Sequence, residues 1–146
     1  MKDVIKAILY AIATAILFVL FLYMTSFVVW AHEYTPEDIV LIGMLVEHEC
    51  PNESEKGQRL VIDTVLNRVE SDEFPNTVKE VLSQPGQYCN PSKYPPKDIY
   101  RLVAEEIYFR TNSEVLWYRT KKYHKYGVPI VKEGAHYFSG MIFKIM

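Results

Sequence analysis

Glu49 is the side chain whose setting most directly suggests chemistry. It follows the apolar residues Leu45 and Val46 at helical spacing, and Pro51 interrupts the helical pattern two residues later. Apolar neighbours and the negative end of a helix dipole both favour the protonated form of a carboxyl group. A carboxylic acid that keeps its proton near neutral pH can protonate a leaving-group oxygen, as in the cleavage of a bond between two sugars. The combination of helix end, helix break and the motif that follows therefore predicts a general acid at Glu49. The alternative is an exposed glutamate at a helix end without a catalytic role.

A second carboxyl group is usual in glycoside cleavage. Glu53 is the nearest candidate, because residues four apart share one face of a continuous helix. Pro51 interrupts that helix, so the spacing alone does not make Glu53 a catalytic partner. Asp63 lies within the next predicted helix, where we expect a solvated polar position.

Metal and nucleotide chemistry is not predicted. The pair His48-Glu49 resembles the start of a zinc-protease motif, but Asn52 stands where that motif needs its second histidine. Phosphate-binding glycine loops and a serine nucleophile elbow are also absent from the sequence. We therefore expect no metal site and no cofactor.

The first part of the chain is a predicted membrane segment. Residues 7–31 carry no charge, and about 20 apolar helical residues span a bilayer core. Lys2 and Lys6 precede this segment while acidic residues follow it, which predicts a cytoplasmic N-terminus and an extracytoplasmic domain. We therefore divide the chain into a single-pass transmembrane anchor, residues 1–34, and a catalytic domain, residues 35–146. The alternative is a cleaved signal sequence and a secreted protein.

The charge balance of the remaining chain excludes one class of partner. It has 14 basic and 17 acidic residues, because two lysines and one aspartate of the first segment are subtracted from totals of 16 and 18. A balance of −3 does not indicate a surface for nucleic acid. The densest basic run is residues 119–125, which we interpret as a solvated turn rather than a phosphate-binding patch. Contact of this run with an acidic polymer of the cell envelope stays open.

Two cysteines, Cys50 and Cys89, follow the predicted anchor. An oxidising compartment would allow a disulfide between them. Two unpaired buried thiols are the alternative.

The pattern after the anchor predicts a mainly helical α+β domain with a small antiparallel sheet. Thr35-Pro36 has the signals of a helix start, and Ser54 and Thr77 can cap two further helices. Short aromatic or β-branched segments near the C-terminus, separated by glycine-bearing turns, favour strands. We expect helices over residues 36–50, 55–71, 78–83 and 96–112, and strands over residues 115–118, 128–131 and 135–138.

Six short blocks follow one another between Leu45 and Phe138. They are Glu49 with Glu53 and Gly57-Gln58; Val65-Leu66-Asn67-Arg68-Val69; Phe74-Pro75-Asn76-Thr77-Val78; Gln84-Pro85-Gly86-Gln87-Tyr88; Leu116-Trp117-Tyr118; and Gly134-Ala135-His136-Tyr137-Phe138. In this order they resemble the SleB/CwlJ-type cell-wall hydrolases, the family that includes spore cortex-lytic enzymes. The sequence departs from that family at Cys50-Pro51-Asn52, where the family usually has small, basic and glycine residues.

The resemblance implies a lysozyme-like fold and an enzyme that cuts the glycan strands of peptidoglycan with Glu49 as its acid. It also favours lytic transglycosylation over hydrolysis by water. In that reaction the muramic C6 hydroxyl attacks and leaves a 1,6-anhydro end. Glu49 would first protonate the glycosidic oxygen and then accept the proton of the hydroxyl.

Polar and aromatic side chains that suit a sugar ring are the predicted substrate-binding residues. They are Glu53, Gln87, Tyr88, Trp117, Tyr118 and His136. Core packing is the alternative for the aromatic members. Asn67 and Arg68 are candidates for orienting a loop by hydrogen bonds, with exposure on a helix surface as the alternative.

One function of another class stays open at this point. A non-catalytic, membrane-anchored domain that binds peptidoglycan or a partner protein would share the anchor and the aromatic residues. It would not depend on the acid at Glu49.

Overall fold

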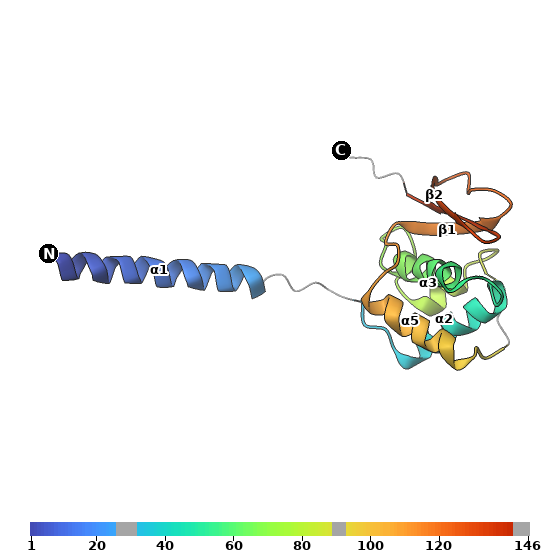
Figure 1. The fold of residues 1–146 in the computed structure, drawn as a ribbon, viewed down its shortest axis with the longest axis horizontal. Helices are drawn as coiled ribbons and strands as arrows, with labels where there is room; N and C mark the ends of the chain where they lie inside the picture. Colours follow the sequence, from blue (N-terminus) through green and yellow to red (C-terminus); the bar gives the residue numbers. More distant parts are fainter. Residues whose placement is uncertain (26–31, 89–92, 142–146) are drawn as a thin grey trace. The chain divides into compact units, whose positions relative to one another are not determined.

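The chain forms two compact units, Met1–His32 and Glu33–Met146. The computed structural model describes residues 1–25, 32–88 and 93–141 (Figure 1). The first unit holds the helix α1 (Lys2–Thr25). Its stretch Lys2–Phe21 is long and apolar enough to cross a membrane, with a mean hydropathy of 2.5. A signal sequence passes the same test, so the anchor and the signal sequence both stand as predictions.

The second unit is mainly helical with one small sheet, as predicted. Each predicted element is present, with ends that differ by a few residues. The elements are α2 (Pro36–Glu49), α3 (Glu55–Val69), α4 (Val78–Leu82), α5 (Lys97–Tyr108), β1 (Val115–Thr120), β2 (Val128–Glu133) and β3 (His136–Gly140).

The helix α2 begins and ends on local signals that can be read in the sequence. The Thr35 hydroxyl accepts a hydrogen bond from the Asp38 backbone N–H at 3.2 Å, and the Asp38 carboxylate accepts one from the Thr35 N–H at 2.9 Å. This reciprocal arrangement is a capping box. At the other end Pro51 disfavours helical geometry at Cys50, so Glu49 is the last helical residue.

The helix α3 is the centre of the domain. The sheet packs on one side of it, and α2, α4 and α5 pack on the others (Figure 1). All residues of α3 from Leu60 to Val69 are buried. The prediction that Asp63 is solvated is therefore wrong: this residue is 0% exposed, and its Oδ2 accepts a hydrogen bond from the Asn112 N–H at 2.7 Å.

The polar side of α3 holds the start of β1. Asn67 Nδ2 donates hydrogen bonds to the carbonyls of Asn112 and Val115 at 2.9 and 2.8 Å, and Arg68 Nε donates to the carbonyl of Leu116 at 2.7 Å. The expectation that both residues orient a connecting segment is confirmed. Their alternative role as solvated surface residues is wrong, because they are 7% and 3% exposed.

The three strands of the sheet are antiparallel in the order β1-β3-β2. The last strand in the sequence is therefore the central one. Tyr118 on β1 is opposite Phe138 on β3, and Thr120 is opposite His136. Phe138 is fully buried against the apolar residues of the helices, which fixes the inner face of the sheet.

Cys50 is buried, and no disulfide joins it to another described residue. Burial raises the pKa of this thiol to about 12, and the nearby carboxylates of Glu53, Glu49 and Glu47 add to the effect. Cys89 lies outside the described residues, so the Cys50–Cys89 disulfide stays a prediction.

Candidate active site

Glu49 lines a cavity of roughly 400 Å³ that is bounded by the end of α2, the loop after α4 and the sheet. Three predicted substrate-binding residues, Gln87, Tyr118 and His136, line the same cavity. They come from three separate segments of the chain. The fold therefore brings the predicted acid and half of the predicted sugar-binding residues together.

A second cavity of roughly 290 Å³ adjoins the first, and the two share Gln87, Tyr118 and Arg119. It adds Tyr88 and Trp117 from the predicted set. We call the two cavities together the Glu49 site. All of the predicted substrate-binding residues except Glu53 line it.

The aromatic rings of the site also pack on one another. The Tyr118 ring meets His136 edge-on with centroids 5.4 Å apart, and it lies 6.3 Å from the Tyr88 ring. Trp117 stacks on His124 at 5.5 Å with an interplanar angle of 8°. Sugar binding and core packing are therefore not exclusive roles, because these rings support one another while they line a cavity.

Two phenol groups of the site stay neutral near neutral pH. Burial raises the pKa of Tyr88 to about 12, with a further contribution from the charge of Glu49. Burial, Tyr88 and Glu49 likewise raise the pKa of Tyr118. Both hydroxyls are buried and have no hydrogen-bond partner among the described residues. Each can therefore donate its O–H to an oxygen of a ligand.

Glu53 occupies a different position from the one its sequence spacing suggests. Its Oε1 accepts a hydrogen bond from the Ala135 N–H at 3.0 Å and lies 3.5 Å from His136 Nδ1. It does not line either cavity of the Glu49 site. Glu53 therefore contacts His136, which lines the site, and the turn before β3. It does not face the cavity as a second carboxyl group.

The residues that sequence reasoning missed are basic. Arg119, Lys121 and Lys122 line the cavity of Glu49, whereas the sequence favoured a solvated turn over residues 119–125 and left contact with an acidic polymer open. All three are exposed, as that expectation implies. One sequence feature could have indicated that these cations lie at the site: the basic run directly follows the predicted sugar-binding block Leu116-Trp117-Tyr118.

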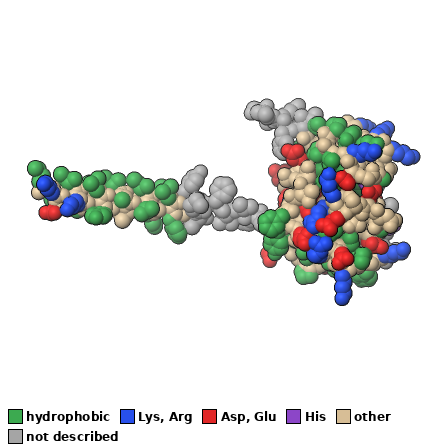
Figure 2. Space-filling model, viewed as in Figure 1, with side chains coloured by type: hydrophobic (Ala, Val, Ile, Leu, Met, Phe, Trp, Pro, Cys, Tyr) green, Lys and Arg blue, Asp and Glu red, His purple; other side chains and the backbone are tan. Residues whose placement is uncertain are grey.

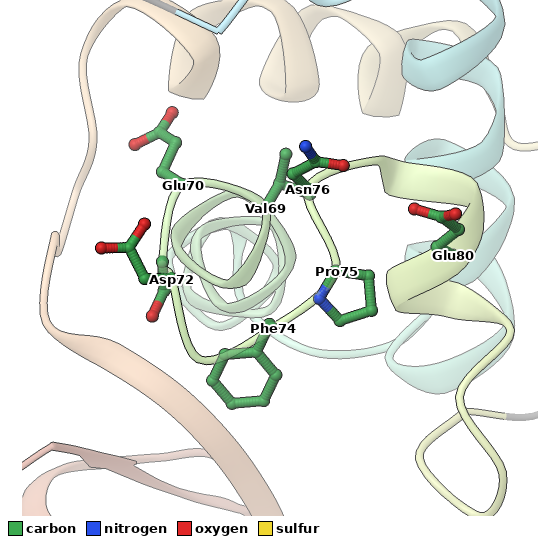
Figure 3. Close-up of a pocket in the computed structure, with 8 residues that line it drawn as sticks. Val69, Glu70, Asp72, Phe74, Pro75, Asn76 and Glu80 are labelled. Carbon is green, nitrogen blue, oxygen red and sulfur yellow. The ribbon is translucent and has the colours of Figure 1, made fainter.

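A separate cavity of roughly 610 Å³ lies at the C-terminal end of α3. Figure 3 shows Glu70 and Asp72 at that helix end and Glu80 on α4. Among the described residues, no Lys, Arg or His lines this cavity, and none of the predicted site residues does. Its carboxylates do not converge with the aromatic residues that surround Glu49. In the part of the chain that the structure describes, no group of three or more His, Cys, Asp or Glu could hold a metal ion.

The Glu49 site combines a carboxyl group, aromatic rings and an amide, which are the residue types that suit an enzyme acting on a polysaccharide. The sequence profile of the cell wall hydrolase family matches residues 52–139. This protein therefore belongs to the cell wall hydrolase family. Glu49 lies just before the matched range.

Two solved structures are similar over most of the domain. The crystal structure of the catalytic domain of the Bacillus cereus SleB protein is 28% identical, covers 73% of this chain and 92% of that chain, and has a TM-score of 0.66. The catalytic domain of the germination-specific lytic transglycosylase SleB from Bacillus anthracis is 27% identical, with coverages of 73% and 96% and a TM-score of 0.64. A search of curated proteins finds no match.

These comparisons confirm the SleB/CwlJ-type resemblance and the fold that it implied. The protein is an enzyme that degrades the peptidoglycan of the cell wall. The alternative of a non-catalytic binding domain is not supported.

Proposed function

We propose that this protein cleaves the glycan strands of peptidoglycan with Glu49 as general acid and base. One observation carries the assignment. Glu49 is the only carboxylate among the described residues that line the two cavities of the Glu49 site. It shares its own cavity with the amide of Gln87, the ring of Tyr118 and the imidazole of His136.

The reaction that fits a single carboxyl group best is lytic transglycosylation. Glu49 donates its proton to the glycosidic oxygen as the bond from that oxygen to the muramic C1 breaks. The muramic C6 hydroxyl then bonds to C1, and the Glu49 carboxylate accepts the hydroxyl proton. The products are a free hydroxyl on the leaving sugar and a 1,6-anhydro end, and Glu49 regains its starting state.

Hydrolysis by water is the second candidate. It ordinarily needs a second carboxylate, either to activate the water or to form a covalent intermediate. The Glu53 carboxylate is held by the Ala135 N–H and lies beside His136. This engagement, together with the transglycosylase activity named for the similar Bacillus anthracis domain, favours transglycosylation.

The products of purified peptidoglycan treated with the full-length protein in detergent distinguish these reactions. Mass spectrometry is expected to find 1,6-anhydro ends, which are one water lighter than reducing ends. Reducing ends alone would indicate hydrolysis, and an uncut substrate would overturn the proposed function.

The variant Glu49→Gln tests the assignment of the acid. It is expected to lose a factor of about 10² to 10⁴ in kcat, because it keeps the shape of the side chain but cannot transfer a proton. The matched control is Glu47→Gln on the same helix, since Glu47 does not line the Glu49 site. Equal activity of the Glu49→Gln variant and the control would remove Glu49 from the mechanism.

We further infer that α1 holds the domain outside the cytoplasm, where the cell wall lies, with the N-terminus inside. Support comes from the apolar stretch Lys2–Phe21 and from the lysines at its start. Membrane fractionation and the mass of the mature protein test this inference. A soluble protein that lacks α1 would instead indicate a cleaved signal sequence.

A further inference from the structure

The cations that line the cavity of Glu49 have no ion-pair partner among the described residues. Arg119, Lys121 and Lys122 form no ion pair or side-chain hydrogen bond with any described residue, and Glu49 is the one carboxylate that lines the cavity with them. The cations around the helices behave differently. Lys56, Arg59, Arg101 and Arg110 each pair with a glutamate.

Basic side chains are also unevenly distributed on the face of the domain that Figure 2 shows. Figure 2 shows Lys and Arg side chains gathered over the part of the domain where the sheet lies, whereas basic and acidic side chains alternate over the helical part. Unpaired charges of one sign beside a cavity raise the local concentration of ligands of the opposite sign. The observed surface favours an anionic group on the ligand.

Lys121 is held in an unusual backbone conformation at this cavity. Its φ is 76°, and it is the only non-glycine residue with positive φ in the described part of the chain. Lysine has no short polar side chain to stabilise this left-handed geometry, as asparagine and aspartate have. Strain of this kind collects at functional sites, and here it lies where β1 ends beside Glu49.

The adjoining cavity contains a buried cation with an unused donor. Arg68 is 3% exposed and lies 5.0 Å from the Phe74 ring centroid and 5.3 Å from that of Tyr88. Its Nε binds the Leu116 carbonyl, but its Nη1 is buried without a partner among the described residues. A buried donor without an acceptor is costly, so Arg68 also favours an anionic ligand in this part of the site.

We propose that Arg119, Lys121 and Lys122 form a subsite for the carboxylates of the peptides attached to the glycan strand that is being cut. This proposal rests on the proposed function. The cations share a cavity with the acid, so the anion must lie close to the bond that Glu49 protonates. The peptides are attached to muramic acid beside that bond and carry carboxylates, which arginine and lysine both bind.

A wall polymer rich in phosphate is the competing ligand. Such a polymer bonded to the muramic C6 oxygen would remove the hydroxyl that attacks in transglycosylation. The peptide carboxylates leave that hydroxyl free. They are therefore the favoured source of the negative charge.

Variants of the two lysines test the subsite with the full-length protein in detergent. Lys121→Asn removes the charge while asparagine tolerates the positive φ, and Lys122→Gln removes the second charge. The double variant is expected to raise KM for peptide-bearing glycan strands about five- to tenfold with little change in kcat. Lys79→Gln on α4 is the matched control, because Lys79 is exposed and lines neither cavity of the Glu49 site.

The substrate is varied in parallel. Chemical amidation of the peptide carboxylates is expected to raise KM for the unmodified enzyme and to abolish the difference from the double variant. Equal KM values for the double variant and the unmodified enzyme on native strands would overturn the proposal. It would also be overturned if removal of wall phosphate by acid abolished the lysine dependence and amidation did not.

These outcomes are separate from a failure of the proposed function. An unmodified enzyme that cuts neither native nor amidated strands contradicts the function itself. An enzyme that cuts both equally well, with or without the lysines, contradicts only the subsite. Thermal unfolding of each variant shows whether a change in KM reflects binding or misfolding.

Discussion

The carboxylate of Glu53 fills the space that a side chain at Gly134 would need. A Cβ built on Gly134 would overlap Glu53 Oε2 and come within 2.5 Å of Glu53 Cδ. Gly134 also has a φ of +53°. The turn that leads into β3 and His136 therefore depends on a residue without a side chain, packed directly on a carboxylate.

Gly134→Ala is expected to lower the free energy of unfolding by about 2 to 4 kcal/mol. Backbone strain at positive φ contributes about 1 to 2 kcal/mol. Displacement of the Glu53 carboxylate, which then loses its hydrogen bond from the Ala135 N–H, adds about 1 to 3 kcal/mol. Gly86→Ala is the matched control, because Gly86 has a φ of +71° and no atom within 4 Å of the added Cβ. Chemical denaturation measures the unfolding free energy of both variants. The difference between the two losses gives the contribution of the Glu53 contact apart from that of backbone strain.

Glu53→Ala in the Gly134→Ala background completes this comparison as a double-mutant cycle. Without the Glu53 carboxylate, Gly134→Ala is expected to lower the free energy of unfolding by the same amount as Gly86→Ala. If Gly134→Ala and Gly86→Ala are equally destabilised from the start, overlap with Glu53 is not the cause.

Glu53→Gln is expected to reduce kcat by about tenfold, far less than the effect of Glu49→Gln. Glutamine keeps an acceptor for the Ala135 N–H but loses the negative charge 3.5 Å from His136. Steady-state kinetics on soluble glycan strands measure the difference. Equal losses in the two variants would instead make Glu53 a second catalytic carboxylate.

Arg68→Lys is expected to destabilise the domain by about 2 to 4 kcal/mol, because a lysine cannot replace a planar guanidinium in contact with two rings. The change would also weaken the hydrogen bond to the buried Leu116 carbonyl. Arg101→Lys, at an exposed pair with Glu105, is the control and is expected to change the unfolding midpoint little. A similar shift in both variants would mean that the ring contacts of Arg68 contribute little.

Asp63 gives the domain a predictable dependence on pH. Burial raises the pKa of Asp63 from 3.8 to about 9, and the neighbouring carboxyl of Glu106 adds to the effect. Burial alone would also raise the pKa of Glu106, but hydrogen bonds from Asp63, Arg59 and Thr111 leave it lowered. Near neutral pH the folded protein therefore keeps a proton on Asp63 that the unfolded chain releases.

The sign of this dependence follows from the raised pKa. The contribution of Asp63 to stability is complete below pH 3.8 and falls as the pH rises towards about 9, by at most about 1.4 kcal/mol per pH unit. Asp63→Asn is expected to flatten the decline in the unfolding free energy between pH 5 and 9. An unchanged slope in this variant would assign the decline to other groups.

The ends of the helices could be predicted because they depend on neighbouring residues. Thr35 and Asp38 form their capping box within four residues, and Pro51 acts on the residue before it. The burial of Asp63 could not be predicted in this way. It depends on Asn112, 49 residues further along the chain, and the apolar pattern of α3 does not indicate such a distant partner.

In the candidate site, too, some features could be predicted from the sequence and others could not. Gln87, Tyr118 and His136 could be proposed as partners of Glu49 because their blocks resemble a known family, and they do line one cavity. The position of Glu53 against the turn at Gly134 brings together residues far apart in the chain, as in its hydrogen bond with Ala135, 82 residues further along, and no local pattern specifies such a contact. The unpaired state of Lys121 and Lys122 likewise depends on which carboxylates the fold leaves out of reach.

The strand order has a consequence for when this enzyme becomes active. β1 and β2 each pair with β3 and not with each other, so no part of the sheet can form before residues 136–140 have been made. Tyr118 and His136 face the same cavity only after that point. A chain that ends before β3 therefore has Glu49 but not the rest of the cavity around it, and wall cleavage is expected to require residues 136–140.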